Sequence, residues 1–285
     1  MRNKSIYLAV LLAFVGSFAS AQTAEVPQNY VEQANCDLNM NMIYVEGGKF
    51  IMGANEDDMD AYENEFPRHY VYLDSYYIAE CEVTQEQWEM IMGNTIHDYI
   101  AVSEFNGYPV EPIVGENFPM NCVNWYDAQM FCARLSQLTG KTYVLPTEAQ
   151  WEYAARGGKK GKGYKYSGSY SIDAVAWYCS NSLIDVECSW GCYTTCYLHP
   201  VKQKRPNELG LYDMSGNVWE WCADWYGNYV DKYQSNPTGP GSGSRRVLRG
   251  GNRYNEPFQC RVSYRDTGNP YSRYSTRGFR VICIP

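Results

Sequence analysis

The sequence contains little histidine and, after Phe18, no long hydrophobic run. Only 3 of its 285 residues are histidine: His69, His97 and His199. We interpret each of them as structural rather than as a metal ligand, since His69 lies in an expected strand and His199 precedes a proline. No later segment is apolar over a length that could span a membrane. The chain also has no excess of positive charge, and its net charge of −8 argues against binding to nucleic acid or to an anionic membrane.

The first 21 residues have the pattern of a secretory signal peptide. Arg2 and Lys4 precede an apolar run over 6–18, and Ala-Ser-Ala at 19–21 forms a small-residue cleavage site. We therefore expect cleavage near Ala21 and export to the periplasm, the cell surface or the medium. An uncleaved membrane anchor is the alternative, and the clear cleavage site argues against it. Cleavage would leave 264 residues (285 − 21) and would take the formal charge from −8 to −10.

All 11 cysteines follow the expected signal peptide. In an oxidising compartment most of them should be paired, and the odd number leaves at least one over. Four cysteines lie close together: Cys179, Cys188, Cys192 and Cys196. The last three have a spacing that resembles a metal site, but zinc sites more often combine shorter spacings with histidine. We expect local disulfides here, with the pairing left open.

Residues 42–285 are expected to form one domain after a polar leader at 22–41. Short apolar runs predict a hairpin over 42–53 around Gly47-Gly48, and strands at 69–73 and 76–78. Capping residues and one apolar face predict helices from Thr84 to about Met92, from about Trp125 to Gly140, and from Thr147 to Gly157. The acidic stretch 55–65 and the proline-containing stretch 93–119 are expected to be loops.

Residues 241–285 contain nine arginines, no lysine, and only Glu256 and Asp266 as acids. Val247, Val262 and Val281 lie in short alternating runs, so we expect these runs to be strands of one sheet. A guanidinium group matches a carboxylate in shape and can donate two hydrogen bonds to it. We therefore expect these arginines to pair with the acidic stretches upstream rather than to bind an anion.

Residues 210–221, Gly-Leu-Tyr-Asp-Met-Ser-Gly-Asn-Val-Trp-Glu-Trp, combine apolar side chains with the carboxylates of Asp213 and Glu220. Burying an uncompensated carboxylate is very costly. A calcium ion held by both carboxylates and by backbone carbonyls of a turn at Gly216 would compensate them. Alternatively, the stretch is a buried turn whose carboxylates accept hydrogen bonds from backbone N–H groups and from arginine. The spacing alone favours this second interpretation.

Four motifs in this order resemble one protein family. They are Leu-Pro-Thr-Glu-Ala-Gln-Trp-Glu-Tyr-Ala-Ala-Arg-Gly-Gly at 145–158, the stretch 210–221, Arg-Gly-Gly at 249–251 and Gly-Phe-Arg at 278–280. From Met42 to Cys283 the chain resembles the formylglycine-generating enzyme, or sulfatase-modifying factor, family. The resemblance implies an α+β, loop-rich fold of the modified C-type-lectin type, with short strands and a few helices.

The resemblance also implies a structural calcium ion at 210–221. Its ligands would be the side chains of Asp213 and Glu220 and the carbonyl groups of Gly216 and Val218. A second calcium site would involve Asn181 and Ser182, with further ligands from the stretch near Tyr193, where no Asp matches. The family also links the regions of Cys132 and Cys283 to each other.

In this family two cysteines bind copper, activate oxygen and convert a sulfatase cysteine to formylglycine. Cys260 matches the second of them, whereas Asn255 stands where the first would be. Two thiolates suit Cu(I), and an amide does not. Our first hypothesis is therefore a non-catalytic, exported binding or scaffold protein. The alternative is a copper-dependent formylglycine-generating oxidase acting on a sulfatase, or a related metal oxidase that uses Cys260.

The segment 252–276 is rich in Tyr, Ser, Asn, Gly and Arg. This composition is typical of antibody contact surfaces, and it resembles the variable C-terminal segment of lectin-fold proteins that retroelements diversify. An ordinary polar loop is the alternative interpretation. A protein or peptide ligand would contact six residues, which should then lie together on one exposed face: Tyr254, Asn255, Phe258, Tyr271, Ser272 and Tyr274.

Overall fold

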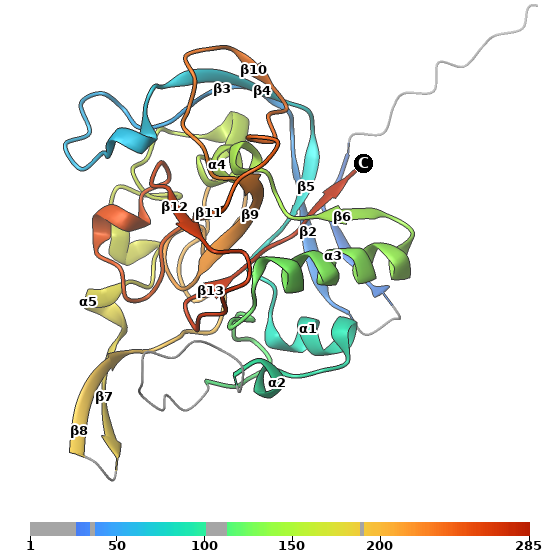
Figure 1. Cartoon of the computed structure of the whole chain (residues 1–285), viewed down its shortest axis with the longest axis vertical. Helices are drawn as coiled ribbons and strands as arrows, with labels where there is room; N and C mark the ends of the chain where they lie inside the picture. The colour runs from blue at the N-terminus through green and yellow to red at the C-terminus, as the bar shows by residue number, and fades with distance from the viewer. Residues whose placement is uncertain (1–26, 35–37, 101–112, 189–190) are drawn as a thin grey trace, which may run out of the picture.

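The computed structural model describes residues 27–34, 38–100, 113–188 and 191–285. The expected signal peptide and Cys36 lie outside these residues. Short strands and long connections alternate along the chain (Figure 1), which confirms the expected loop-rich α+β organisation. None of the helices in the described part is long and apolar enough to cross a membrane.

The described strands form four sheets. The five-stranded sheet has the order β1 (Tyr30–Glu32), β2 (Met40–Val45), β5 (Tyr76–Ala79), β14 (Ile282–Ile284) and β6 (Thr142–Val144). The three-stranded sheet consists of β10 (Gln234–Ser235), β4 (His69–Leu73) and β3 (Gly48–Met52). The four-stranded sheet consists of β12 (Asp266–Gly268), β11 (Arg246–Arg249), β9 (Trp219–Trp225) and β13 (Arg277–Gly278). The hairpin of β7 (Leu183–Cys188) and β8 (Gly191–Cys196) projects from the body (Figure 1).

The strands expected at 69–73 and 76–78 are confirmed as β4 and β5. The hairpin expected over 42–53 is wrong, because β2 pairs with β5 and β3 pairs with β4. Both ladders are antiparallel and keep the same register on either side of Gly47. A Cβ atom on Gly47 would lie 2.5 Å from the carbonyl oxygen of Leu73. The glycine pair therefore bends one long pair of strands instead of reversing the chain.

The three helices expected from capping residues are confirmed. They are α1 (Gln85–Met92), α3 (Trp125–Thr139) and α4 (Glu148–Ala155). The side chains of Thr84 and Thr147 accept hydrogen bonds from the third helical N–H, and Gly140 ends α3 in the left-handed conformation. On α3, Leu138 is 45% exposed, so the expected apolar face stops one turn early.

Two further helices, α2 (Ile96–Ile100) and α5 (Cys179–Ser182), were not expected from the sequence. The loop expected over 93–119 is therefore wrong at α2, and residues 101–112 lie outside the described part. Both helices are short, so neither shows the repeated apolar spacing by which a longer helix is recognised.

The three C-terminal valines do not share one sheet, which corrects the sequence expectation. Val247 lies in β11, Val262 lies in no strand, and Val281 precedes β14 in a different sheet. Arg261 and Arg265 are 1% and 3% exposed, because their side chains turn inward to carboxylates. At 261–265 the alternation of Arg with other residues thus reflects buried ion pairs, whereas at Val247 it belongs to the strand β11.

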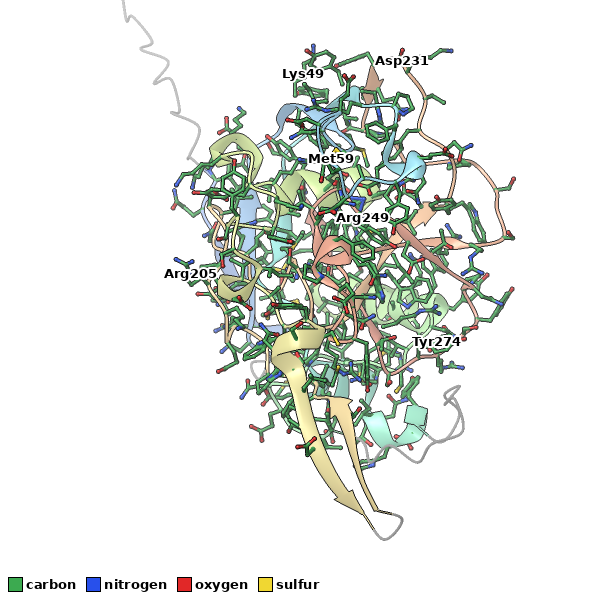
Figure 2. The ribbon with its side chains drawn as sticks, turned by 90° about the vertical axis from the view of Figure 1, so that its left-hand side faces the viewer. Lys49, Met59, Arg205, Asp231, Arg249 and Tyr274 are labelled. Carbon is green, nitrogen blue, oxygen red and sulfur yellow. The ribbon has the colours of Figure 1, made fainter. Side chains whose placement is uncertain are left out.

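The expected pairing of C-terminal arginines with upstream acids is confirmed at α4. Arg265 donates to both carboxylate oxygens of Glu148, at 2.6 and 2.7 Å. Arg249 donates to Glu148 at 3.1 Å and to Glu152 at 2.6 Å. Arg249 lies in the centre of the molecule (Figure 2) and is fully buried. Helix α4 and the C-terminal segment are therefore held together by charge as well as by apolar contact.

A second ion-pair group joins the C-terminal segment to the acidic stretch 55–65. Arg261 donates to both oxygens of Glu65, at 2.9 and 2.6 Å, and to Asp58 at 2.9 Å. Glu65 is fully buried. The expectation that this stretch is a solvated loop is therefore wrong at Glu65, because a buried guanidinium compensates its charge.

Candidate functional site

The turn at 213–217 has an unusual backbone that its neighbours hold in place. Asp213, Gly216 and Asn217 have φ angles of 57°, 85° and 58°. The N–H of Asn217 donates to the carbonyl of Trp177 at 2.8 Å, and the N–H of Gly216 donates to that of Gly250 at 2.9 Å. A Cβ atom on Gly216 would lie 2.1 Å from the carbonyl oxygen of Trp177, so only glycine fits there.

Glu220 is bound on both carboxylate oxygens. Arg280 donates through Nη2 to Oε1 at 2.6 Å and through Nε to Oε2 at 2.7 Å, and Trp151 donates through Nε1 to Oε2 at 2.7 Å. Glu220 and Arg280 are both 0% exposed. Glu220 is therefore a buried carboxylate that is compensated by an arginine, which is the second of the two alternatives considered for 210–221.

Asp213 and Glu82 form a buried acidic pair beside that ion pair. Asp213 accepts a hydrogen bond from the N–H of Lys202 at 2.8 Å, and Glu82 accepts from Asn217 and from the N–H of Val218 at 3.1 and 3.3 Å. Burial raises the pKa of Asp213 to about 6. Burial and the negative charges of Asp213 and Glu220 raise the pKa of Glu82 well above its ordinary value.

The expected calcium ligands fit this turn only in part. Glu220 does not fit, because Arg280 and Trp151 already occupy its two oxygens. Asp213 does fit, since its buried carboxylate has a raised pKa and no cationic side chain bonded to it. Sequence reasoning missed Glu82, which lies more than 100 residues before the motif and follows a strand with no metal-binding pattern. No group of three or more His, Cys, Asp or Glu side chains that could hold a metal occurs in the part of the chain that the structure describes.

Cys260 ends a short 3-10 helix, Pro257–Cys260, and is 0% exposed. Its neighbours in the surrounding cluster are apolar or aromatic: Tyr166, Ile172, Val175, Ala176 and Tyr178. Burial raises the pKa of the Cys260 thiol to about 12, so the thiol is protonated at neutral pH. In this conformation such a buried, neutral thiol is a poor nucleophile and a poor metal ligand.

Asn255, in the position of the first family cysteine, shapes the local turn. Its side-chain oxygen accepts from the N–H of Asn252 at 2.8 Å, and its own N–H donates to the Asn252 carbonyl at 2.9 Å. Its carbonyl accepts from the N–H of Cys179 at 3.0 Å. The amide therefore has a structural role in this turn.

The six expected binding residues differ in exposure. Tyr254 and Tyr271 are 41% and 68% exposed, whereas Ser272 is buried. The other three are half-buried: Asn255, Phe258 and Tyr274. Of the aromatic residues in the segment 252–276, only Tyr254 and Tyr271 are exposed.

These residues also have different neighbours. Tyr254 lies within hydrogen-bonding distance of Thr195 in β8, with 3.0 Å between the hydroxyl oxygens. The ring of Tyr271 lies 4.9 Å from that of Tyr126, at the start of α3. Phe258 contacts the rings of Tyr62 and Tyr264 at 5.9 and 6.2 Å, and Tyr274 lies under the guanidinium group of Arg277 at 4.2 Å. Sequence reasoning missed Tyr62 and Tyr126, because they come from distant parts of the chain.

One buried arginine connects two of these neighbourhoods. Arg253 donates to the carbonyl of Cys196 at 3.1 Å and to that of Ser275 at 2.9 Å, and its guanidinium group lies 5.0 Å from the Tyr254 ring. Figure 2 places Tyr274 on the side of the molecule toward which the β7–β8 hairpin extends. Arg253 thus contacts the hairpin, Tyr254 and the segment that contains Tyr274.

The remaining expected sites are not assembled among the described residues. Cys132 and Cys283 are both buried, free thiols, and no disulfide occurs among the eight described cysteine side chains. The side chains of Cys188, Cys192 and Tyr193 lie outside the described part. The side-chain amide of Asn181 accepts a hydrogen bond from the N–H of Tyr178 at 2.9 Å and donates one to the carbonyl of Ala176 at 3.0 Å. His199 stacks on Trp177 with 3.6 Å between ring centroids, which agrees with its structural interpretation.

Comparison with known proteins identifies the class. The sulfatase-modifying factor enzyme 1-like domain family matches residues 27–284, so the chain belongs to this family. The solved structure of Treponema denticola variable protein 1 superposes with a TM-score of 0.73 at 31% identity, covering 91% of this chain and 100% of that one. This likeness agrees with the modified C-type-lectin-like fold expected from the sequence.

Two similar proteins carry names that describe different activities. A chaperone protein LppX of Paenibacillus barcinonensis is 29% identical over 99% of this chain and 99% of its own length. A formylglycine-generating enzyme of Streptomyces coelicolor is 37% identical over 63% of this chain, and the match spans 55% of that enzyme. Membership of the family therefore does not by itself assign an activity.

The buried Glu220–Arg280 pair should be important for the stability of the fold. Glu220→Gln should lower the free energy of unfolding by roughly 3–5 kcal/mol, because Arg280 would stay buried without a compensating carboxylate. Glu46→Gln is the matched control, since the Glu46 and Lys159 side chains are 61% and 49% exposed and such pairs contribute less than about 1 kcal/mol. Urea denaturation of both variants measures the difference. Equal midpoints for the two would contradict the prediction.

Proposed function

We propose that this chain is an exported, non-catalytic binding or scaffold protein built on the sulfatase-modifying factor fold. One observation carries the proposal: Cys260 is enclosed and protonated, and Asn255 shapes a turn where the second thiol would be needed. Copper-dependent chemistry needs thiolates that reach the metal. Cys260 would meet that requirement only after a rearrangement of the apolar cluster, and Asn255 has no thiol.

The likeness to a structure named as a variable protein supports the binding role. It extends over almost the whole of both chains at 31% identity. In this chain the segment 252–276 holds Tyr254 and Tyr271 at the surface, while Arg261 and Arg265 are buried against carboxylates. Rigid aromatic side chains with hydroxyl groups bind protein or peptide surfaces at a low cost in conformational entropy. We therefore assign the ligand contact to the exposed side chains of Tyr254 and Tyr271.

The catalytic alternative has a direct test. The mature chain, loaded with copper and supplied with oxygen, should not convert the cysteine of a sulfatase-derived peptide to formylglycine. Mass spectrometry of the peptide, with a formylglycine-generating enzyme as the positive control, measures the conversion. Aldehyde formation that disappears in Cys260→Ser would overturn the non-catalytic assignment.

The binding face has a paired test. The variant Tyr254→Ala/Tyr271→Ala should weaken binding to the partner captured by chemical crosslinking on the cell surface by about tenfold or more, because exposed aromatic side chains are frequent interface hot spots. The control is Tyr70→Ala/Tyr233→Ala, which removes two tyrosines that are 50% and 60% exposed. Both contact Lys49, which lies at the end opposite the β7–β8 hairpin (Figure 2).

Titration of the purified partner against each variant by calorimetry measures the affinities. An equal loss in both pairs of variants, or no loss in either pair, would contradict the assignment of this face.

We further propose that calcium is bound at the turn through Asp213, with Glu82 as the second carboxylate in place of Glu220. The ion would compensate two buried carboxyl groups that accept hydrogen bonds from N–H groups and an amide but from no cationic side chain. The carbonyl groups of Gly216 and Val218 remain the expected backbone ligands. Glu220 keeps its structural pairing with Arg280.

The raised pKa of Asp213 makes this calcium proposal testable by pH. In the folded protein without calcium this pKa is about 6, above the ordinary value of 3.8. The stabilising contribution of the protonated carboxyl is then complete below about pH 4 and is lost as the pH rises through 6, by roughly 3 kcal/mol. Bound calcium should abolish this loss, because it favours the ionised carboxylate.

Thermal unfolding at pH 4, 5, 6 and 7, with EGTA or with calcium, measures the effect in the wild type and in Asp213→Asn. We expect a chelator-dependent decrease of Tm toward pH 7 in the wild type that Asp213→Asn lacks. Glu220→Gln should lower Tm equally with and without calcium. A wild-type Tm that does not respond to calcium at any of these pH values would exclude the site.

A further inference from the structure

The base of the β7–β8 hairpin brings two thiols together. Cys179 begins α5 and is half-buried, and Cys196 ends β8 and is 5% exposed. Their Sγ atoms lie 3.9 Å apart. The N–H of Tyr197 donates to the carbonyl of Ser182 at 2.6 Å, so the two chain segments already lie side by side at this point. Figure 2 shows the hairpin extending from this base away from the body.

Both thiols border the segment 253–255 of the proposed ligand face. The N–H of Cys179 donates to the carbonyl of Asn255 at 3.0 Å, and Arg253 donates to the carbonyl of Cys196 at 3.1 Å. Beside Cys196, the hydroxyl oxygen of Thr195 lies 3.0 Å from that of Tyr254. Anything that fixes the hairpin base therefore also fixes the support of Tyr254.

We propose that Cys179 and Cys196 form a reversible disulfide that locks the hairpin base against the segment 253–255 and so orders Tyr254. This inference names a single pair among the four cysteines of the region and gives the pair a role. The role in ligand contact rests on the proposed function, whereas the disulfide itself does not.

The reaction is thiol–disulfide exchange with an external disulfide, such as oxidised glutathione or a disulfide oxidoreductase. The thiolate of Cys179, the more exposed of the two, attacks the external disulfide and releases one external thiol. The Cys196 thiolate then displaces the second external thiol from the mixed disulfide. Two protein thiols are oxidised and one external disulfide is reduced to two thiols.

The geometry needs only a local adjustment. The sulfur atoms have to approach from 3.9 Å to about 2.05 Å. Burial and the neighbouring Cys179 thiol raise the pKa of Cys196 to about 11, so little Cys196 thiolate is present at neutral pH. Arg253, which lies next to Cys196, partly offsets this effect. Cys179 is the attacking group because it is more exposed.

Peptide mapping tests the bond. The mature chain is reduced, oxidised with oxidised glutathione, alkylated, and digested with Asp-N and chymotrypsin, which separate the four cysteines of the region. We expect a linked pair of peptides containing Cys179 and Cys196, in the wild type and in Cys188→Ser/Cys192→Ser. Linkage of Cys179 to Cys188 or Cys192, or full alkylation of both thiols after oxidation, would overturn the proposal. So would protection that needs Cu(I) and disappears with a Cu(I) chelator.

Hydrogen exchange tests the coupling without any ligand. Exchange of the backbone amides at 253–255 should be about tenfold slower in the oxidised chain than in the reduced chain, because the cross-link restricts local opening. Cys179→Ser and Cys196→Ser, checked for folding by circular dichroism, should show no difference between the two conditions. Linked peptides without slower exchange would overturn the lock. Neither result depends on whether the tyrosine variants lose binding, so a failure of the proposed function remains distinguishable.

Discussion

Buried arginine–carboxylate pairs are the interaction on which the rest of this structure depends. Arg261, Arg265 and Arg280 bind carboxylates that are 196, 117 and 60 residues away in the sequence. Each pair is bidentate and almost fully removed from water. Such pairs add little net stability when they are complete, but losing one partner leaves a buried charge and is strongly destabilising. They therefore specify where the C-terminal segment lies, which short strands alone could not do.

This anchoring separates the inside of the C-terminal segment from its surface. Arg261, Arg265, Arg280 and Cys260 are buried, whereas Tyr254 and Tyr271 are exposed. Surface residues carried by a rigid scaffold can differ without loss of the fold, which is the usual basis for binding loops. The same apolar cluster buries Cys260 and keeps its thiol neutral.

Sequence patterns predicted local structure well where the cause is local. The helices capped by Thr84 and Thr147 and the helix ended by Gly140 are present, because a cap is satisfied within one turn. The hairpin around Gly47 was wrong, because the partner strands are supplied from further along the chain. The single C-terminal sheet was wrong for a similar reason: alternation cannot distinguish a pleat from arginines that turn inward to distant acids.

By itself, the sequence determined the family, the boundaries of the three capped helices and the arginine pairing as a class. Each of these can be read from residue identity and spacing. Only the tertiary structure decided which carboxylate each arginine binds, that Glu220 belongs to Arg280, and that Glu82 lies beside Asp213. The tertiary structure alone also placed Cys179 next to Cys196, and Tyr254 next to the neighbouring Thr195. The physical reason is that burial, desolvation and charge compensation depend on groups that meet only when distant segments pack together.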